Sequence, residues 1–386
     1  MSPSISCREA LDAIRRGERL PAEVVRSLGE EQPGEFFRVI VEALADSFDP
    51  AQAAAYDELM RAWILTTLPT GPATNPTVPD RVDTVYVLSR VTLGADIKIT
   101  SIILSAMKKL FRDASIVLVA NRKSVELFKA DTRIWHLEAD YPRSGPVSRR
   151  IEFAHELRDR LEGANRIVVD PDSRMTQLGL VPVCEARYTF HFPSRTANSA
   201  DNLTELTQRW LEDVFGESGE AYIAPDRVPI EGDSPRAAIS LGVGENESKR
   251  IGGDFEAQVI RTLGEKYRTI WIDRGVGGEE ARRVTAAAEA SGVIDRVRFW
   301  EGSFAGFASL ISQCDFYVGY DSAGQHAAAA AGVPLISIFA GAPSDRFRQR
   351  WRPAGPGLIE VMDADSLTPN GCLERFRGAR SVSQNV

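Results

Sequence analysis

The feature that most constrains this chain is an alternation of short β-rich runs with longer helical stretches, which occurs in two successive series. In the first series, residues 82–89, 115–121 and 166–170 predict strands, and residues 97–111 and 147–162 predict helices. Strands that alternate with helices in this way are typical of βαβ units, whose strands form a parallel sheet. The first series therefore predicts a doubly wound α/β domain.

The series restarts near residue 236 and predicts a second domain of the same kind. Five runs predict strands, at residues 236–244, 268–275, 295–302, 315–321 and 334–341. The helices expected with them lie near residues 254–265, 279–291, 304–313 and 323–331. A helix at 199–216 and a crossing segment to about residue 235 connect the two series. We therefore expect an α/β fold with two Rossmann-like doubly wound domains that face each other across a cleft.

The N-terminal residues follow a different pattern. Up to about residue 68 the apolar residues recur at helical spacing, which predicts a helical extension, and residues 68–80 contain four prolines, as a linker or surface loop does. The expected division of the chain is 1–80 for the extension and linker, 81–200 for the first domain, 201–345 for the second domain with a linker helix at about 201–235, and 346–386 for a tail that packs back on the domains.

Charge and cysteine content exclude several classes of protein. The 54 acidic and 46 basic residues give a formal net charge of -8, which argues against a surface that wraps nucleic acid. The four cysteines form no CxxC pair, so neither a disulfide framework nor a zinc site is indicated. The first twenty residues are charged where a signal peptide is apolar, and Gly332 and Pro334 interrupt the longest apolar stretch. We therefore expect a cytoplasmic protein without a membrane span.

The turn after residues 315–321 is the first candidate site. Asp321 and Ser322 make this turn, and Ala323 and Gly324 begin a helix without side chains that would block its backbone N–H groups. The first N–H groups of a helix and its positive end suit a phosphate. Small residues would let that phosphate come close, so the turn predicts an anion site.

A histidine follows one helical turn later. His326 lies four residues after Ser322, on the same face, where it could donate to a phosphate oxygen or a sugar hydroxyl. A structural explanation is also open, because Ser322 and Gln325 fit a capping box and the alanines after His326 suit close packing of the helix on the sheet.

A second loop, after the strand at 236–244, offers donors and cations. Its candidate residues for binding a diphosphate are Gly244, Glu245, Lys249 and Arg250. The loop has neither the ending of a Walker motif nor a GxGxxG fingerprint. The alternative is that Lys249 is an ordinary exposed lysine on a turn.

Two carboxylates complete the set of candidates. Asp96 starts a helix after the Gly94–Ala95 turn, so we expect its carboxylate at the cleft, where it could act as a general base; the alternative is an ordinary helix cap. Either Glu279 or Glu280 could reach a ribose, although acids at the start of a helix are favoured by the helix dipole in any case.

Two stretches carry a resemblance to a known family. "GYDSAGQHAAAAAGVPLISIFAGAP" (319–343) and "GADIKITSIILSAMKKLFRDASIVLV" (94–119) resemble glycosyltransferase family 9, the bacterial ADP-heptose:lipopolysaccharide heptosyltransferases, and "GENESKR" (244–250) is similar to the family's loop that ends in lysine. The sequence departs from the family pattern at three positions. Ala95 stands where the glycine before the aspartate is usual, Ile102 replaces a proline, and Ala323 is inserted before Gly324.

The resemblance, which spans about residues 82–343, implies a GT-B fold and an inverting glycosyltransferase of lipopolysaccharide biosynthesis. It implies Asp96 as the base, Lys249 as the cation on the diphosphate, and the turn at 322–324 as the phosphate cradle, with His326 nearby. It implies no metal ion and no cofactor, and a nucleotide sugar, ADP-heptose-like, as the donor substrate.

The acceptor is implied to be a glycan or glycolipid. Lys98, Arg122 and Arg143 could meet its phosphates, although such charges are often solvated surface. Peripheral association with the inner face of a membrane would fit such an acceptor. Two rival functions stay open: a nucleotide-sugar epimerase or hydrolase of the same fold, and a catalytically silent nucleotide-sugar-binding scaffold. The scaffold would be favoured by an Asp96 that is turned away from the cleft or paired off.

Overall fold

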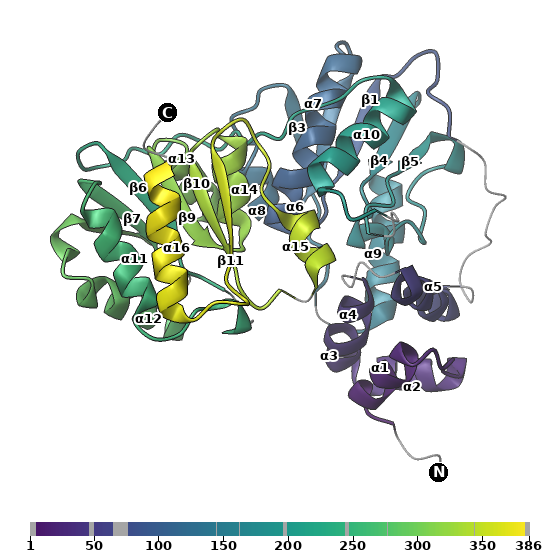
Figure 1. The fold of residues 1–386 in the computed structure, drawn as a ribbon. Helices are drawn as coiled ribbons and strands as arrows, with labels where there is room; N and C mark the ends of the chain where they lie inside the picture. The colour runs from purple at the N-terminus through teal and green to yellow at the C-terminus, as the bar shows by residue number, and fades with distance from the viewer. Residues whose placement is uncertain are drawn as a thin grey trace.

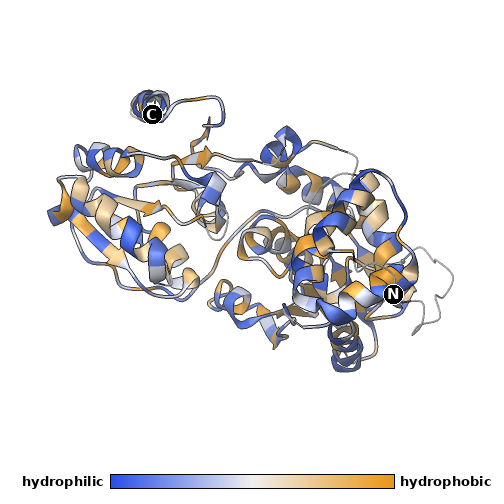
Figure 2. Ribbon diagram, turned by 90° about the horizontal axis from the view of Figure 1, so that it is seen from below, coloured by the Kyte–Doolittle hydropathy of each residue, from blue (hydrophilic) through white to orange (hydrophobic). Residues whose placement is uncertain are grey.

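The computed structural model describes residues 5–45, 50–64, 76–143, 145–161, 163–195, 199–243, 247–275, 277–342 and 344–382. Two lobes, each a parallel sheet flanked by helices, lie side by side, and a group of N-terminal helices packs below the first lobe (Figure 1). This arrangement confirms the expected α/β class, with two doubly wound domains and a helical extension. In Figure 2 the helices around both sheets carry hydrophilic and hydrophobic residues on the same ribbon, as amphipathic helices do.

The sheet of the N-terminal lobe has the order β3-β2-β1-β4-β5. Its strands are β1 (Thr84–Leu88), β2 (Ser115–Ala120), β3 (Ile134–Glu138), β4 (Arg166–Asp170) and β5 (Thr189–His191). Val85 pairs with Ile116 on one side and with Ile167 on the other, all three fully buried. The chain builds outward from β1 in one direction and then from β4 in the other, so the order of this sheet reverses between β1 and β4.

The sheet of the C-terminal lobe has the order β11-β10-β9-β6-β7-β8. Its strands are β6 (Arg236–Ser240), β7 (Thr269–Asp273), β8 (Val297–Trp300), β9 (Phe316–Tyr320), β10 (Leu335–Phe339) and β11 (Ile359–Asp363). All five residues of β9 and of β10 are buried, as expected for central strands covered by helices on both faces. The order of this sheet reverses between β6 and β9.

Helices connect the strands of both lobes. In the N-terminal lobe these are α6 (Leu93–Ala95), which continues through the π-helical turn η2 (Asp96–Thr100) into α7 (Ser101–Leu110), then α8 (Arg122–Glu126), α9 (Val147–Arg160) and α10 (Leu203–Phe215). In the C-terminal lobe they are α11 (Phe255–Gly264), α12 (Gly278–Ala290), α13 (Phe304–Ile311), α14 (Ala323–Ala330), α15 (Asp345–Trp351) and α16 (Pro369–Val382). Short 3-10 turns are η3 (Arg174–Thr176), η4 (Ala186–Tyr188), η5 (Glu247–Lys249) and η6 (Ile294–Arg296).

The N-terminal helices share a hydrophobic core with the first lobe. They are α1 (Cys7–Arg15), α2 (Ala22–Glu31), α3 (Pro33–Glu35), η1 (Phe36–Val41), α4 (Glu42–Ala45) and α5 (Pro50–Ile64). Phe36 and Ile40 are fully buried in one cluster with Val119 of β2. The guanidinium of Arg150 on α9 lies 3.4 Å from the centre of the Phe37 ring, a cation–π contact between the two parts. The extension is therefore part of the first lobe's core and not a detached arm.

Segments that lie outside the two predicted series of strands also pack against one or the other lobe. α10 packs on α7, and its Leu203 and Leu211 are buried in the cluster that contains β1 and β2. β11 pairs with β10, and α16 packs on α11.

The expected domain boundaries near residues 200 and 345 stay a prediction. In the part of the chain that the structure describes, no helix has the length and apolar character needed to cross a membrane.

Candidate active site in the cleft between the lobes

The loops at the two reversal points of the sheets meet in a cleft. Ligands of open α/β sheets bind beyond the carboxyl ends of the strands at such points. A pocket of about 250 Å³ lies there. From the N-terminal lobe it is lined by Arg90, Thr92, Gly94, Ala95, Arg174 and Arg195, and from the rest of the chain by Lys249, Asp321, Ser322, His326, Phe347 and Trp351. The cleft expected between the two domains is therefore present, and it contains four of the candidate donor-binding residues.

The N-terminus of α14 points its first turn at this pocket without a side-chain cap. Ser322 is the N-cap residue and its backbone is extended, but its side chain accepts no hydrogen bond from the first turn. The capping box with Gln325 does not form, because Gln325 Nε2 donates to Asp321 Oδ1 at 2.6 Å and its Oε1 accepts from the Ser337 hydroxyl. The first backbone N–H groups of α14 are thus left for water or a ligand.

The small residues after Ser322 serve two different contacts. A Cβ atom on Gly324 would lie 2.2 Å from Tyr317 Oη, so glycine is needed here for the packing of α14 on β9. Ala323 lines a separate groove on the other side of Gly94. Gly324 thus has a packing reason of its own, and its place in a phosphate cradle stays a prediction.

Lys249 reaches the pocket from η5 and pairs with the loop after β9. Its Nζ lies 2.8 Å from Asp321 Oδ2, and the two side chains are 21% and 9% exposed. Asp321 therefore holds Lys249 in place at the edge of the pocket. Arg250 lies near Glu247 and outside this pocket. Gly244 and Glu245, also expected here, lie outside the described residues.

His326 lies at the base of the pocket between the two lobes. It is 5% exposed, and its ring centre lies 5.9 Å from that of Trp351. A Cβ atom on Gly94 would lie 3.2 Å from His326 Cδ2, so the lobes touch at this point. Burial, with the charges of Lys98 and Lys249, lowers the pKa of His326 well below its usual value. The imidazole is therefore neutral at neutral pH and can donate one hydrogen bond and accept another.

Three arginines on the facing wall were missed by the sequence analysis. Arg90 follows β1 and is 2% exposed, with its guanidinium donating to Pro171 O at 2.9 Å and to the Ser194 hydroxyl. Arg174 follows β4 and pairs with Glu42 of α4. Arg195 follows β5 and donates through its guanidinium to the backbone oxygen of Asp172. In the sequence, the three arginines share only their position shortly after a strand. Exposed surface arginines occur at such positions as well, so this position does not identify a site.

Asp96 is not where the sequence analysis expected it. Its carboxylate is fully buried, whereas Ala95 lines the pocket. It accepts four hydrogen bonds, from the Ser89 hydroxyl (2.7 Å), Arg90 N (2.8 Å), the Thr100 hydroxyl (2.8 Å) and the Ser124 hydroxyl (2.6 Å). Burial raises the pKa of Asp96 although these hydrogen bonds oppose the shift. A raised pKa suits a base, but a base must also reach the hydroxyl that it deprotonates, and this carboxylate faces the lobe interior.

The three residues expected to meet the acceptor divide into two groups. Arg122 and Arg143 line a groove of about 690 Å³ that also contains Lys123, Asp140 and Ala323 and that shares Thr92 and Gly94 with the cleft pocket. Lys98 is 2% exposed and donates to Asn202 Oδ1 (2.6 Å), Thr204 Oγ1 (3.2 Å) and Arg352 O (2.6 Å). Burial lowers its pKa to about 7. Lys98 therefore connects segments of the chain and does not face the groove.

The acidic start of α12 lies away from the cleft pocket. Glu279 is exposed. It is Glu280 whose carboxylate packs beside the loops at Gly242 and Gly275, where a Cβ atom would lie 2.8 and 2.5 Å from Glu280 Oε1. No group of three or more potential metal-ligating side chains occurs among the described residues.

The comparisons with known proteins agree with this architecture. Residues 257–368 match glycosyltransferase family 9 (heptosyltransferase). The fold is similar to a glycosyl transferase family 9 protein from Veillonella parvula (TM-score 0.59, 15% identity, covering 81% of this chain and 92% of that one). It is also similar to the E. coli heptosyltransferase WaaC, solved with ADP-2-deoxy-2-fluoro heptose (TM-score 0.56, 16% identity, 78% and 100%) and with ADP (0.55, 15%, 77% and 99%). Among curated proteins, none matches the sequence.

The family match covers the strand–turn–helix unit of Asp321 to His326 together with α15, and the likeness of fold covers both lobes. Residues 257–368 therefore match the model of glycosyltransferase family 9, and the whole chain has a two-lobed GT-B fold similar to that of heptosyltransferase structures.

Proposed function

We propose that the protein transfers a sugar from a nucleoside diphosphate donor to an acceptor, with inversion and without a metal ion. The observation that carries the proposal is the charge of the cleft. Among the described residues, Lys249, Arg90, Arg174 and Arg195 line one pocket with a single carboxylate, that of Asp321. A diphosphate placed between them would also meet the uncapped N-terminus of α14.

These groups can neutralise a departing nucleoside diphosphate without a divalent ion. Guanidinium groups and helix N–H groups stabilise phosphate charge as a metal would, and a dry cleft strengthens each interaction. The neutral ring of His326 adds a hydrogen bond donor next to Ser322. Because WaaC was solved with ADP and with an ADP-heptose analogue, we propose an ADP-heptose-like donor for this chain.

The groove next to the cleft is the proposed place of the acceptor. Arg122, Lys123 and Arg143 line it with one carboxylate, Asp140. This charge balance fits an acceptor that carries phosphate or carboxylate groups, such as a lipid-linked glycan. The groove and the cleft pocket share Thr92 and Gly94, so an acceptor in the groove would extend towards the donor site.

A second candidate function is nucleotide-sugar binding without transfer. The observation that favours it is Asp96, whose carboxylate is held by four donors inside the lobe. The variant Asp96→Asn separates the two functions. If Asp96 is the base, the folded variant binds ADP as the wild type does but transfers no sugar. If Asp96 is structural, the free energy of unfolding falls and transfer falls only as far as the folded fraction does.

The test of the proposal has two stages. A panel of ADP-, UDP- and GDP-sugars is first screened by thermal shift, because a ligand at a hundred times its dissociation constant adds about 2.7 kcal/mol of stability. Release of the nucleoside diphosphate from the best donor is then measured with and without a lipid-linked glycan, in EDTA. Acceptor-dependent release in EDTA supports metal-independent transfer. Release without acceptor would indicate a hydrolase or epimerase, and binding without release would indicate the silent protein.

A further inference from the structure

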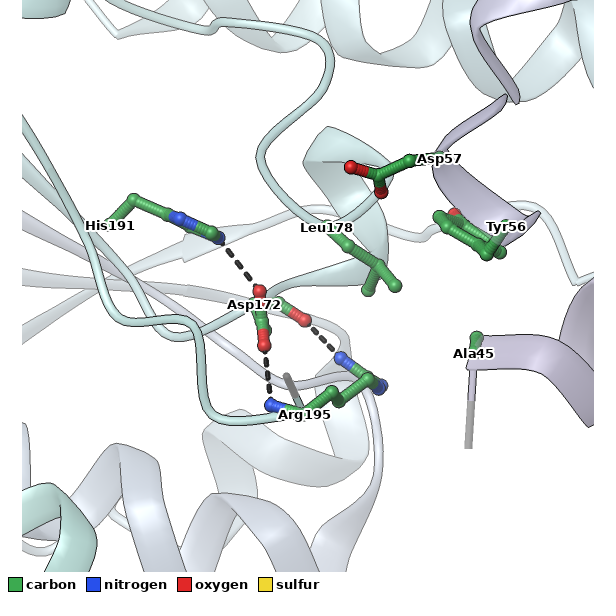
Figure 3. Close-up of a pocket in the computed structure, with 7 residues that line it drawn as sticks. All are labelled: Ala45, Tyr56, Asp57, Asp172, Leu178, His191 and Arg195. Carbon is green, nitrogen blue, oxygen red and sulfur yellow. Dashed lines mark hydrogen bonds and ion pairs between the residues drawn. The ribbon is translucent and has the colours of Figure 1, made fainter. Parts of the chain in front are cut away.

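A second pocket, of about 90 Å³, lies between the N-terminal helices and the first lobe. Ala45, Tyr56 and Asp57 line it from the helical extension, and Asp172, Leu178, His191 and Arg195 line it from the lobe. Figure 3 shows Asp57 and Tyr56 on one side of the pocket and Asp172, His191 and Arg195 on the other. Arg195 also lines the cleft pocket, so the two pockets are neighbours. The volume is far above the roughly 10–15 Å³ that one water needs.

The polar groups of this pocket are held in a fixed arrangement. Asp172 accepts from His191 Nε2 and from Arg195 N, both at 2.7 Å, and its side chain is 3% exposed. A Cβ atom on Gly179 would lie 2.7 Å from His191 Nε2, so the bare glycine packs directly on the imidazole. The ring is thereby fixed between Asp172 and Gly179.

The loop that carries Asp172 and Leu178 has an unusual backbone. Asp172, Gln177 and Leu178 have φ values of 62°, 51° and 60°, the left-handed region that side chains other than glycine rarely adopt. Residues held in such conformations cost free energy and are concentrated at ligand sites.

Among the described residues that line this pocket, two cations face two carboxylates. Burial alone would lower the pKa of His191, but its hydrogen bond to Asp172 and the charges of Asp170, Asp172 and Asp57 raise it to about 9. His191 is therefore a cation at neutral pH, like Arg195. These two cations meet the carboxylates of Asp172 and Asp57. A balanced set of charged donors and acceptors beside the apolar Leu178 and Ala45 suits a neutral ligand with many hydroxyl groups.

We infer that this pocket binds a neutral sugar ring and that the N-terminal helices complete the site by supplying Asp57. Asp57 would accept from hydroxyl groups and His191 would donate to them, on opposite sides of the ring. The inference depends on the proposed transferase function only in assigning the bound sugar to the acceptor. Binding itself is independent of the donor site in the cleft.

The experiment is saturation-transfer NMR on the full chain with D-glucose, D-galactose and D-mannose, and with D-glucuronate as a charged counterpart. At least one neutral hexose is expected to bind with a dissociation constant in the millimolar range, and glucuronate more weakly. His191→Gln and Asp57→Asn are each expected to weaken this binding about tenfold or more. The matched control is Glu58→Gln, on the same helix, because Glu58 pairs with Arg19 at the surface.

Three results would overturn the inference: no binding of any of the three hexoses, equal binding of glucuronate, or hexose binding that survives both pocket variants. Melting curves of each variant show whether the chain is folded. ADP binding is measured by calorimetry on the same samples. ADP binding without hexose binding removes the sugar pocket and leaves the donor site, whereas hexose binding without ADP binding removes the donor site and leaves the pocket.

Discussion

The two lobes have the same architecture and present opposite kinds of surface to the cleft. The C-terminal lobe presents backbone, in the uncapped first turn of α14, with Lys249 held by Asp321. The N-terminal lobe presents side chains, the guanidinium groups of Arg90, Arg174 and Arg195, and keeps the carboxylate of Asp96 inside. The C-terminal lobe thus contributes mainly the N–H groups of one local turn, at the start of α14. The N-terminal lobe contributes guanidinium groups from residues that are far apart in the chain.

This difference separates binding from catalysis. The cations, the imidazole of His326 and the helix N–H groups that face the cleft are suited to hold phosphate or to donate a hydrogen bond. The one residue that the family resemblance implies as a base is buried beneath the N-terminal lobe's surface. Experiments should therefore address the contrast between the diphosphate-binding groups that face the cleft and the carboxylate of Asp96, which is buried.

The largest expected effect is on stability. Asp96→Ala leaves four buried donors without an acceptor, so we expect the free energy of unfolding to fall by about 3 kcal/mol or more. Urea unfolding measures this change. The control is Asp159→Ala, an exposed position on α9 of the same lobe, which should change stability by less than about 0.5 kcal/mol. Equal stability of the Asp96 variant and the wild type would mean that the carboxylate is open to the cleft after all.

The next effect concerns the cation of the C-terminal lobe. Lys249→Ala removes a charge-assisted contact and leaves Asp321 unpaired near the diphosphate, so ADP affinity should fall by about 1.5–3 kcal/mol, roughly 10- to 150-fold. Calorimetry with ADP measures it. Arg250→Ala, the neighbouring residue outside the pocket, should leave the affinity unchanged. Loss of affinity in Arg250→Ala with unchanged affinity in Lys249→Ala would show that the diphosphate does not contact Lys249 in the cleft pocket.

A smaller effect concerns pH and the second pocket. The pKa of His191 is raised to about 9, above that of an unfolded histidine, so its stabilising contribution is complete below about pH 6.5 and is lost as the pH rises through 9. Because a third of the side chain is exposed, we expect a loss of about 1–2 kcal/mol between pH 7 and pH 10. Unfolding of the wild type and of His191→Gln across this range measures it. Parallel pH profiles would show that His191 is not paired with Asp172.

The smallest effect tests the bare helix terminus. Ser322→Ala should change the free energy of unfolding by less than about 0.5 kcal/mol, because the hydroxyl makes no capping hydrogen bond. The matched position is Ser303, which caps α13 by accepting from Gly306 N at 3.2 Å, so Ser303→Ala should cost about 1 kcal/mol. Thermal or urea unfolding of the two variants compares them. A larger cost at Ser322 than at Ser303 would show that α14 is capped by its own side chain.

The elements missed from the sequence lie at the edges of the sheets. β3 and β5 form the two edges of the first sheet, and β11 forms one edge of the second. β3 carries His136 and Glu138 and an exposed Trp135, so it lacks the apolar run of the central strands. Central strands such as β9 are buried on both faces and therefore stand out in the sequence, whereas edge strands depend on pairing with a neighbour.

The sequence by itself determined the central strands of both series and the turn from Asp321 to His326, because periodicity and a strand–turn–helix unit are local properties. Only the tertiary structure decided the N-terminal side of the cleft. Successive helical residues project about 100° apart, so a shift of one position leaves Ala95 at the pocket and turns Asp96 into the core. Likewise, Asp57, Asp172 and Arg195 meet only because the N-terminal helices pack on the lobe, and contacts between such distant segments leave no periodic pattern in the sequence.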